Sequence, residues 1–185
     1  AKKLRTSLKN APTPFLPDED AEIEDADTDG ALGPDASKIL MKILYCARLC
    51  RFDLLRAVNY LSSRVTKWSK RCDARLHRLV SYINCSVDHR LIGWIGDKPQ
   101  DLRLGVWSDA DFAVFKVTMR STSGSFTAIC GPNTFFPMSG YSRKQTCVSK
   151  STPEAELVAA SAALQNEAIP SSSLWNKLIK PWQPK

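Results

Sequence analysis

Four acidic residues have the types and the spacing that metal-dependent chemistry needs. Asp109 and Asp111 lie two apart in "GVWSDAD", so in an extended strand both side chains point to the same face. Glu154 and Glu156 lie in the first turn of a predicted helix in "SKSTPEAELVAASAAL". Carboxylates that converge from a strand and a helix repel each other unless a cation neutralises them, and such oxygen ligands suit Mg²⁺. Asp109 and Glu156 are therefore candidate metal ligands.

The two glutamates have different predicted roles. Ser151 precedes Glu154 by three residues, the spacing of a capping box, so Glu154 is expected to stabilise the start of the helix. Glu156 flanks a stripe that contains Leu157 and Leu164 and that we expect to be buried. If this helix packs on a sheet, Glu156 can face a strand and meet a carboxylate there.

Three segments of different composition must position these residues. Residues 1–34 contain four prolines and the acidic run "DEDAEIEDADTD". We expect a disordered linker there, because such a segment buries too little apolar surface to offset its ordering entropy. Residues 35–98 carry apolar side chains at helical spacing, with a predicted break near residues 51–53. Residues 99–185 make up the third segment.

The second segment is strongly basic. Residues 35–98 hold thirteen Lys and Arg against five Asp. A folded segment of this charge points to a polyanionic partner such as nucleic acid, and a solvated basic helix face is the structural alternative. No secretory signal opens the chain, and no apolar run approaches the ~20 residues of a membrane span. We expect a cytoplasmic or nuclear protein that is not secreted and has no membrane partner.

After Asn84 the apolar period changes from that of a helix to that of a strand. The predicted strands lie in "RLIGWIGD", "LRLGVWSD", "SGSFTAICG" and "NTFFPMSGYSRKQTCVS", and the helix that starts near Ser151 follows them. This order predicts an antiparallel meander packed by a helix, which is an α+β or α/β fold preceded by a helical segment.

The motifs in this region resemble those of a known family. The run "SDADFAVFKVTMRSTSGSFTAICGPNTFFPMSGYSRKQTCVSKSTPEAELVAA" resembles the ribonuclease H (RNase H) region of copia-type LTR retrotransposon Pol polyproteins. That region shows S-D-A-D-W-A-G-D, R-R-S-T-S-G, S-K-K-Q and S-T-x-E-A-E in this order. Upstream, "LYCARLCRFDLLRAVNYLS" is similar to L-x-Y-L-A-x-x-T-R-P-D-I-x-x-A-V-x-x-L-S, which joins the family's reverse transcriptase to its nuclease. The resemblance covers residues 37 to about 175.

The resemblance implies an RNase H-like fold, which in the family hydrolyses the RNA strand of RNA–DNA hybrids with two Mg²⁺ ions. Asp109 matches the first-strand aspartate and Glu156 the helix glutamate, so these two would be the catalytic residues and metal ligands. Six further residues lie where hydroxyls, amides and cations could meet nucleic-acid phosphates: Ser121, Thr122, Ser123, Arg143, Lys144 and Gln145. Ordinary turn chemistry and solvated surface are the alternative for these six. The implied partners are an RNA–DNA hybrid or other nucleic acid and the reverse transcriptase portion of the same polyprotein.

The chain also departs from the family pattern. The family supplies a third carboxylate, an aspartate in a D-N pair on the strand after this helix, whereas only Glu167 follows Glu156 here and no aspartate follows Asp111. Two Mg²⁺ ions carry +4, and Asp109 and Glu156 supply only −2. We therefore expect weak or absent Mg²⁺ binding and an inactive, C-terminally truncated RNase H-like domain over residues 99–185. The alternatives are an active RNase H-type endoribonuclease and a non-catalytic module that binds nucleic acid or protein.

Overall fold

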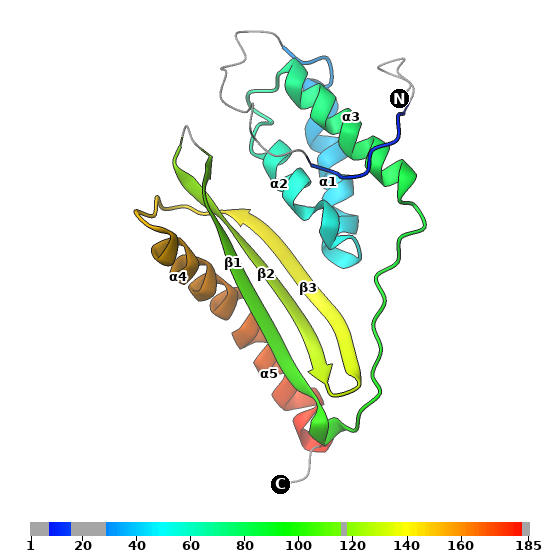
Figure 1. Cartoon of the computed structure of the whole chain (residues 1–185), viewed down its shortest axis with the longest axis vertical. Coiled ribbons are helices and arrows are strands. Elements are labelled where there is room, and N and C mark those ends of the chain that lie inside the picture. Colours follow the sequence, from blue (N-terminus) through cyan, green and yellow to red (C-terminus); the bar gives the residue numbers. More distant parts are fainter. Residues whose placement is uncertain (1–7, 16–28, 116–117, 183–185) are drawn as a thin grey trace. The chain divides into compact units, whose positions relative to one another are not determined.

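The computed structural model describes residues 8–15, 29–115 and 118–182 (Figure 1). The chain divides into two compact units, residues 1–90 and 91–185. The first unit holds the N-terminal helices, and the second holds a three-stranded antiparallel meander packed against a long C-terminal helix. No helix in the described part of the chain is long and apolar enough to cross a bilayer.

The first unit is built from the helices that the apolar spacing predicts. They are α1 (Gly33–Leu49), the 3₁₀ turn η1 (Phe52–Leu54), α2 (Leu55–Ser62) and α3 (Lys70–Cys85). The break predicted near residues 51–53 is confirmed by η1. Leu40, Val58, Leu76 and Leu79 are fully buried and form the core between these helices. Ser69 is the N-cap of α3, and its hydroxyl accepts a hydrogen bond from the backbone amide of Cys72.

Parts of the segment expected to be a disordered linker have defined places in this unit. Residues 8–15 include the buried Ala11, and the ring of Phe15 lies 5.3 Å from that of Tyr60 in an edge-to-face arrangement. Gly30 donates a backbone hydrogen bond to Trp68. The other residues of the linker, 1–7 and 16–28, lie outside the described residues. The first unit ends at residue 90, eight residues before the predicted end of the helical segment.

The sheet of the second unit is a meander in the order β1-β2-β3. A 3₁₀ turn, η2 (Pro99–Asp101), precedes β1 (Arg103–Phe115), and β2 (Arg120–Gly131) and β3 (Thr134–Lys144) follow. The register places Asp109 opposite Gly124, and a bulge follows Thr127 in the pairing of β2 with β3. The prediction of a strand in "RLIGWIGD" is wrong, because this stretch forms only an isolated bridge, between Trp94 and Phe135.

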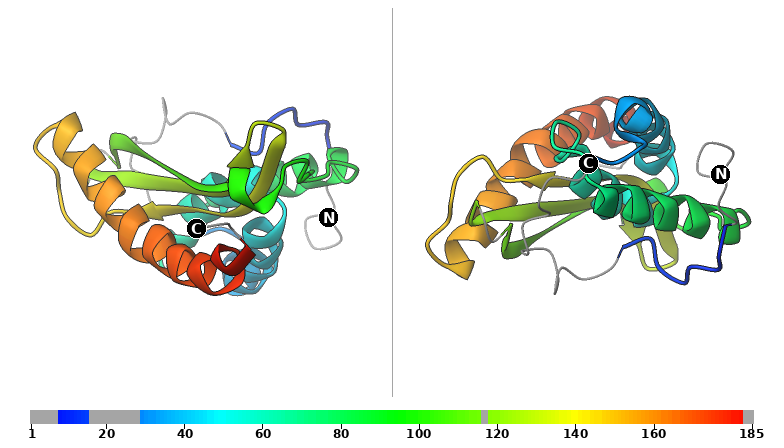
Figure 2. Two further views of the ribbon diagram at one scale, coloured as in Figure 1. Left: turned by 90° about the horizontal axis from the view of Figure 1, so that it is seen from below. Right: turned by 90° about the horizontal axis from the view of Figure 1, so that it is seen from above.

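The C-terminal helix lies along one face of this sheet (Figure 2). It comprises α4 (Thr152–Ala163), the π-helical turn η3 (Leu164–Ala168) and α5 (Ile169–Leu178), and the 3₁₀ turn η4 (Lys180–Trp182) follows. Ala155 and Ala159 of α4 pack against Ala110 of β1.

The stripe that α4 buries differs from the predicted one. Leu157 and Leu164 were expected to be buried, but they are 71% and 56% exposed, and Ala155, Ala159 and Ala163 are buried in their place. Serine and threonine side chains line the face of β2 beneath the helix, at positions 121, 123, 125 and 127. Short alanines let a helix approach such a face closely, and leucines at those positions would hold it away.

Candidate functional site

Asp109 lies on the face of the sheet that α4 does not cover. Ala110, the next residue, is 8% exposed and packs against Ala155 and Ala159 of α4. Because successive side chains of a strand point to opposite faces, Asp109 points away from α4, and it is exposed. A Cβ placed on Gly124, its cross-strand partner, would meet only the carbonyl oxygen of Asp109, at 3.9 Å. This part of the sheet face is therefore open.

Glu156 lies on the other side of β1. It belongs to α4 and is half-buried beside the alanines that face the sheet. The side chain of Asp109 thus leaves the face of β1 that is turned away from the helix of Glu156. Asp111 shares the face of Asp109. Among the described residues no group of three or more His, Cys, Asp or Glu is placed to hold a metal ion. The residues present therefore do not fit a two-magnesium site.

Glu154 stabilises the start of α4, as its spacing predicts. Its Oε2 accepts a hydrogen bond of 2.7 Å from the backbone amide of Lys150. The Oγ of Ser151 accepts one of 3.4 Å from the amide of Glu154. The two side chains satisfy amides that a helix start leaves without intrahelical partners, so the structural role of Glu154 is confirmed.

Three of the six predicted phosphate contacts lie inside the second unit. Gln145 is 5% exposed, and its Nε2 donates to Ser123 Oγ at 2.9 Å and to the carbonyl oxygen of Ala155 at 3.0 Å. The hydroxyl of Ser121, which is also buried, accepts from the amide of Ala113 at 3.1 Å. Ala113 has a φ of 51°, and this bond secures its amide in that left-handed conformation. Gln145 therefore links Ser123 of β2 to α4, and Ser121 links β2 to β1. All three side chains are buried and not accessible to a phosphate.

The other three predicted phosphate contacts are at least partly accessible. Thr122 and Lys144 are half-buried and paired across β2 and β3. Arg143 is exposed, with its guanidinium carbon 5.9 Å from the centre of the Tyr141 ring. Arg143 and Lys144 are neighbours on β3, so their side chains leave opposite faces of the sheet. These three residues do not form one anion site.

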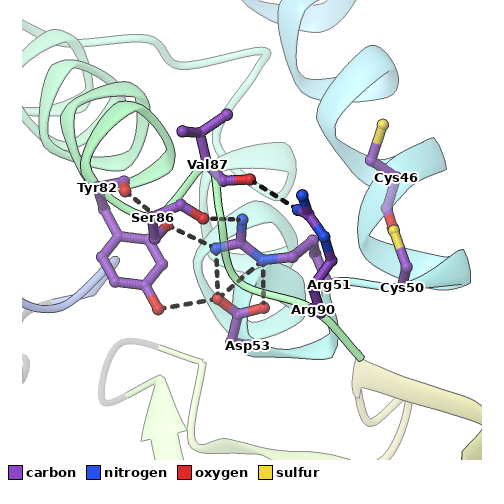
Figure 3. A network of polar contacts seen from close by, with 8 residues as sticks. All are labelled: Cys46, Cys50, Arg51, Asp53, Tyr82, Ser86, Val87 and Arg90. Carbon is purple, nitrogen blue, oxygen red and sulfur yellow. Dashed lines mark hydrogen bonds and ion pairs between the residues drawn. The ribbon is translucent and has the colours of Figure 1, made fainter. Parts of the chain in front are cut away.

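A polar network that the sequence reasoning missed ties together the ends of three helices (Figure 3). Arg51 donates from Nε and Nη2 to the carboxylate of Asp53, at 3.0 and 2.8 Å, and from Nη1 to the carbonyl oxygen of Ser86, at 3.0 Å. The hydroxyl of Tyr82 donates to Asp53 at 2.9 Å. Burial would raise the pKa of Asp53, but the hydrogen bonds from Arg51 and Tyr82 outweigh it and hold the pKa below the ordinary 3.8. The signal was present in "RFDL", where the arginine and the aspartate lie two residues apart.

A cluster of arginines on two aromatic rings was also missed. The guanidinium carbons of Arg64 and Arg75 lie 4.5 and 4.6 Å from the centre of the Tyr60 ring. Arg75 and Arg56 lie 5.6 and 5.0 Å from the centre of the Phe15 ring. The five residues are called the arginine–aromatic cluster below. Charge counting predicted a basic unit, but only the fold shows which arginines gather.

Comparisons of the chain with protein-family models, with curated proteins and with solved structures find no match. Its function is therefore inferred from its own residues and their geometry. These provide a sheet–helix unit without a converging carboxylate pair and a basic helical unit with a defined arginine cluster.

Proposed function

We propose that the chain is a segment of a copia-type retrotransposon Pol polyprotein, covering the connection after the reverse transcriptase and the RNase H-like region. The order of motifs from residue 37 to about 175 supports this origin. So does the order of the elements, three antiparallel strands followed by a packed helix, which is what the resemblance implies for the second unit. The reverse transcriptase portion of such a polyprotein is a proposed partner.

The chain as it stands is proposed not to cleave RNA by the two-metal route. The observation that carries this proposal is the placement of Asp109 on the sheet face opposite α4. Glu167, the only acid after Glu156, is also engaged, because its Oε2 accepts a hydrogen bond of 2.5 Å from Ser139 Oγ. Two separated carboxylates cannot neutralise two divalent ions at one point.

A cleavage assay tests this proposal. The full chain is incubated with a labelled RNA–DNA hybrid and Mg²⁺ or Mn²⁺, alongside Asp109→Asn and the matched variant Asp88→Asn, which removes an exposed carboxylate from the other unit. All three proteins are expected to leave the hybrid intact. Metal-dependent hydrolysis that Asp109→Asn abolishes and Asp88→Asn preserves would show that Asp109 acts in catalysis and would refute the proposal.

Nucleic-acid binding by the first unit is the second proposed function, and the charge of that unit favours it. The unit as a whole, residues 1–90, carries sixteen Lys and Arg against twelve Asp and Glu, and its positive excess lies in residues 35–90, which carry twelve against four. Contacts between such a surface and phosphates release counterions, so the logarithm of the affinity should fall linearly with the logarithm of the salt concentration. Titration of the full chain with a labelled hybrid from about 50 to 200 mM salt measures this slope. A flat response would contradict binding through phosphates.

A further inference from the structure

Four aromatic side chains form a continuous row on the face of the sheet that α4 does not cover. Trp107 of β1 shares this face with Asp109, and the centre of its ring lies 5.7 Å from that of Phe126 on β2. Phe126 lies 6.1 Å from Phe135 of β3, and Trp94, whose backbone bridges to Phe135 beyond β3, continues the row at 6.1 Å. These four residues are called the aromatic row below. They come from four segments, so the row crosses the whole sheet.

Both ends of the aromatic row are accessible. Trp107 is 48% exposed and Trp94 is 54% exposed, and the two phenylalanines between them are half-buried. Neighbouring rings are inclined at 49°, 24° and 37° along the row, so none stands perpendicular to the next. The row differs in this exposure from the arginine–aromatic cluster of the first unit, in which Tyr60 is buried. Contiguous exposed rings of this kind mark a binding surface.

The indole of Trp107 lies over a glycine. A Cβ on Gly105 would be 2.5 Å from Cη2 and 2.9 Å from Cζ3 of that ring. Gly105 pairs with Ala128 of β2, so two small residues leave room for the ring to lie along the strand. The ring therefore extends towards Arg103 and away from Asp109, which are on the same face of β1.

Arg103 places a cation beside this ring. It lies two positions before Gly105, about 7 Å along the strand. Its side chain is exposed, and it forms no hydrogen bond or ion pair with any residue that the structure describes. The N–H donors of its guanidinium are therefore available to a phosphate that lies next to the indole.

We infer that the aromatic row binds the bases of a single-stranded nucleic acid by stacking, and that Arg103 contacts the phosphate beside the base on Trp107. Rings stack on the face of any base, and a duplex hides these faces between neighbouring base pairs, so the occupant is a single strand. Charge favours this occupant over a protein, because Arg103 and Asp109 are exposed on the same face and charged residues are depleted from the core of protein interfaces. The inference goes beyond the phosphate binding proposed for the first unit, because it concerns the second unit and the faces of bases.

The first test removes one ring of the row. Binding of the full chain to a labelled single strand of about 12 nucleotides is measured by fluorescence anisotropy for Trp107→Ala and for the matched control Trp182→Ala. Trp182 is an exposed indole of the same unit outside the row. Loss of one base–ring contact should weaken binding by a factor between about 5 and about 100, with an unchanged salt slope because no charge is lost. Trp182→Ala should leave the affinity unchanged, and Trp107→Phe, which keeps a ring, should recover most of the loss.

The second test removes the cation beside the row. Arg103→Gln should weaken binding of the single strand and lower its salt slope by about 0.7, the value for one phosphate contact of a single strand. Arg120→Gln is the matched control, because Arg120 is exposed at the opposite end of the ladder between β1 and β2. An equal effect of the two substitutions would overturn the role of Arg103.

A blunt RNA–DNA hybrid of the same length separates this surface from the first unit. Trp107→Ala should leave the affinity for the hybrid unchanged. A flat salt response of the hybrid would contradict the binding proposed for the first unit and leave the aromatic row standing. Failure to bind the single strand, an unchanged single-strand affinity of Trp107→Ala, or an equal loss for the hybrid or for Trp182→Ala would overturn the row and leave the binding by the first unit standing.

Two controls keep the result decisive. Circular dichroism compares the fold of each variant with that of the unmodified chain, and Trp94→Ala replaces Trp107→Ala if the latter is unfolded, because Trp94 lies outside the three strands and should show the same loss. Sedimentation velocity tests a second copy of the chain as the occupant. A dimer that either substitution dissociates, with single-strand affinity unchanged, would overturn the inference.

Discussion

Replacing Gln145 by Glu separates a structural role for this side chain from a role in phosphate binding. The amide nitrogen of Gln145 donates to Ser123 Oγ at 2.9 Å and to the carbonyl oxygen of Ala155 at 3.0 Å, in a side chain that is 5% exposed. A glutamate has the same shape, but its ionised form places an oxygen where the donor was, facing a carbonyl oxygen. The unit then contains a buried negative charge, and none of the groups that hydrogen-bond to residue 145 through its side chain carries a positive charge.

The expected loss of stability follows from these contacts. Gln145→Met removes both donors at similar volume, and at about 1 kcal/mol for each net hydrogen bond it should cost about 2 kcal/mol. Gln145→Glu should cost about 3–5 kcal/mol at neutral pH, the range for an uncompensated buried charge. Burial and the facing carbonyl raise the pKa of the introduced carboxyl above that of the unfolded chain. The folded state then holds the proton more tightly, so the loss is largest above the raised pKa and shrinks as the pH falls towards about 4.3.

Urea unfolding followed by circular dichroism, at about pH 7.5 and about pH 5, measures both effects. Gln165→Glu is the matched control, because it makes the same chemical change at an exposed position of the C-terminal helix and should alter stability by no more than about 0.5 kcal/mol. Each variant is compared with the unmodified chain at the same pH. If Gln145→Glu were as stable as Gln165→Glu at neutral pH, or if its deficit did not shrink on acidification, the buried contacts of Gln145 would be refuted.

Three further predictions concern local contacts. Gly105→Ala should cost about 1–3 kcal/mol and shift the near-ultraviolet circular dichroism signal, because an added Cβ would lie 2.5 Å from Cη2 of Trp107, and an unchanged spectrum would contradict this contact. The bond of Asp53 to Arg51 should stabilise the first unit above about pH 5, and this stabilisation should be lost as the pH falls through the lowered pKa of Asp53. Asp53→Asn should therefore flatten the pH dependence of the free energy of unfolding measured in urea titrations. The expected change is about 1 kcal/mol, because the pair is partly exposed. Ser151→Ala should cost about 1 kcal/mol in the same titrations, and no loss would contradict its capping bond.

Much of the fold follows from patterns that lie close together in the sequence. Apolar residues at helical spacing predicted α1, α2 and α3, and the break at residues 51–53 is present as η1. The spacing of Ser151 and Glu154 predicted the start of α4, and both capping bonds are present. Such features depend on contacts within one or two turns, which the local sequence controls.

The candidate site could not be predicted in the same way. The sequence predicted that Asp109 and Asp111 share a face of a strand, and the register agrees. The position of Glu156 relative to the sheet depended on which stripe of α4 packs against the strands. Hydrophobicity favoured the stripe of Leu157 and Leu164, and close packing on a serine-lined strand selected the alanines.

The sequence by itself determined the charge of each segment, the period of each element and the local caps, because these depend on residue type and on neighbours a few positions away. Only the tertiary structure decided that Asp109 and Glu156 lie on opposite sides of β1, that Gln145 is a buried link between sheet and helix, and that three arginines gather on two rings. Each of these depends on how distant segments pack, and packing is selected by the fit of whole surfaces rather than by the identity of one residue.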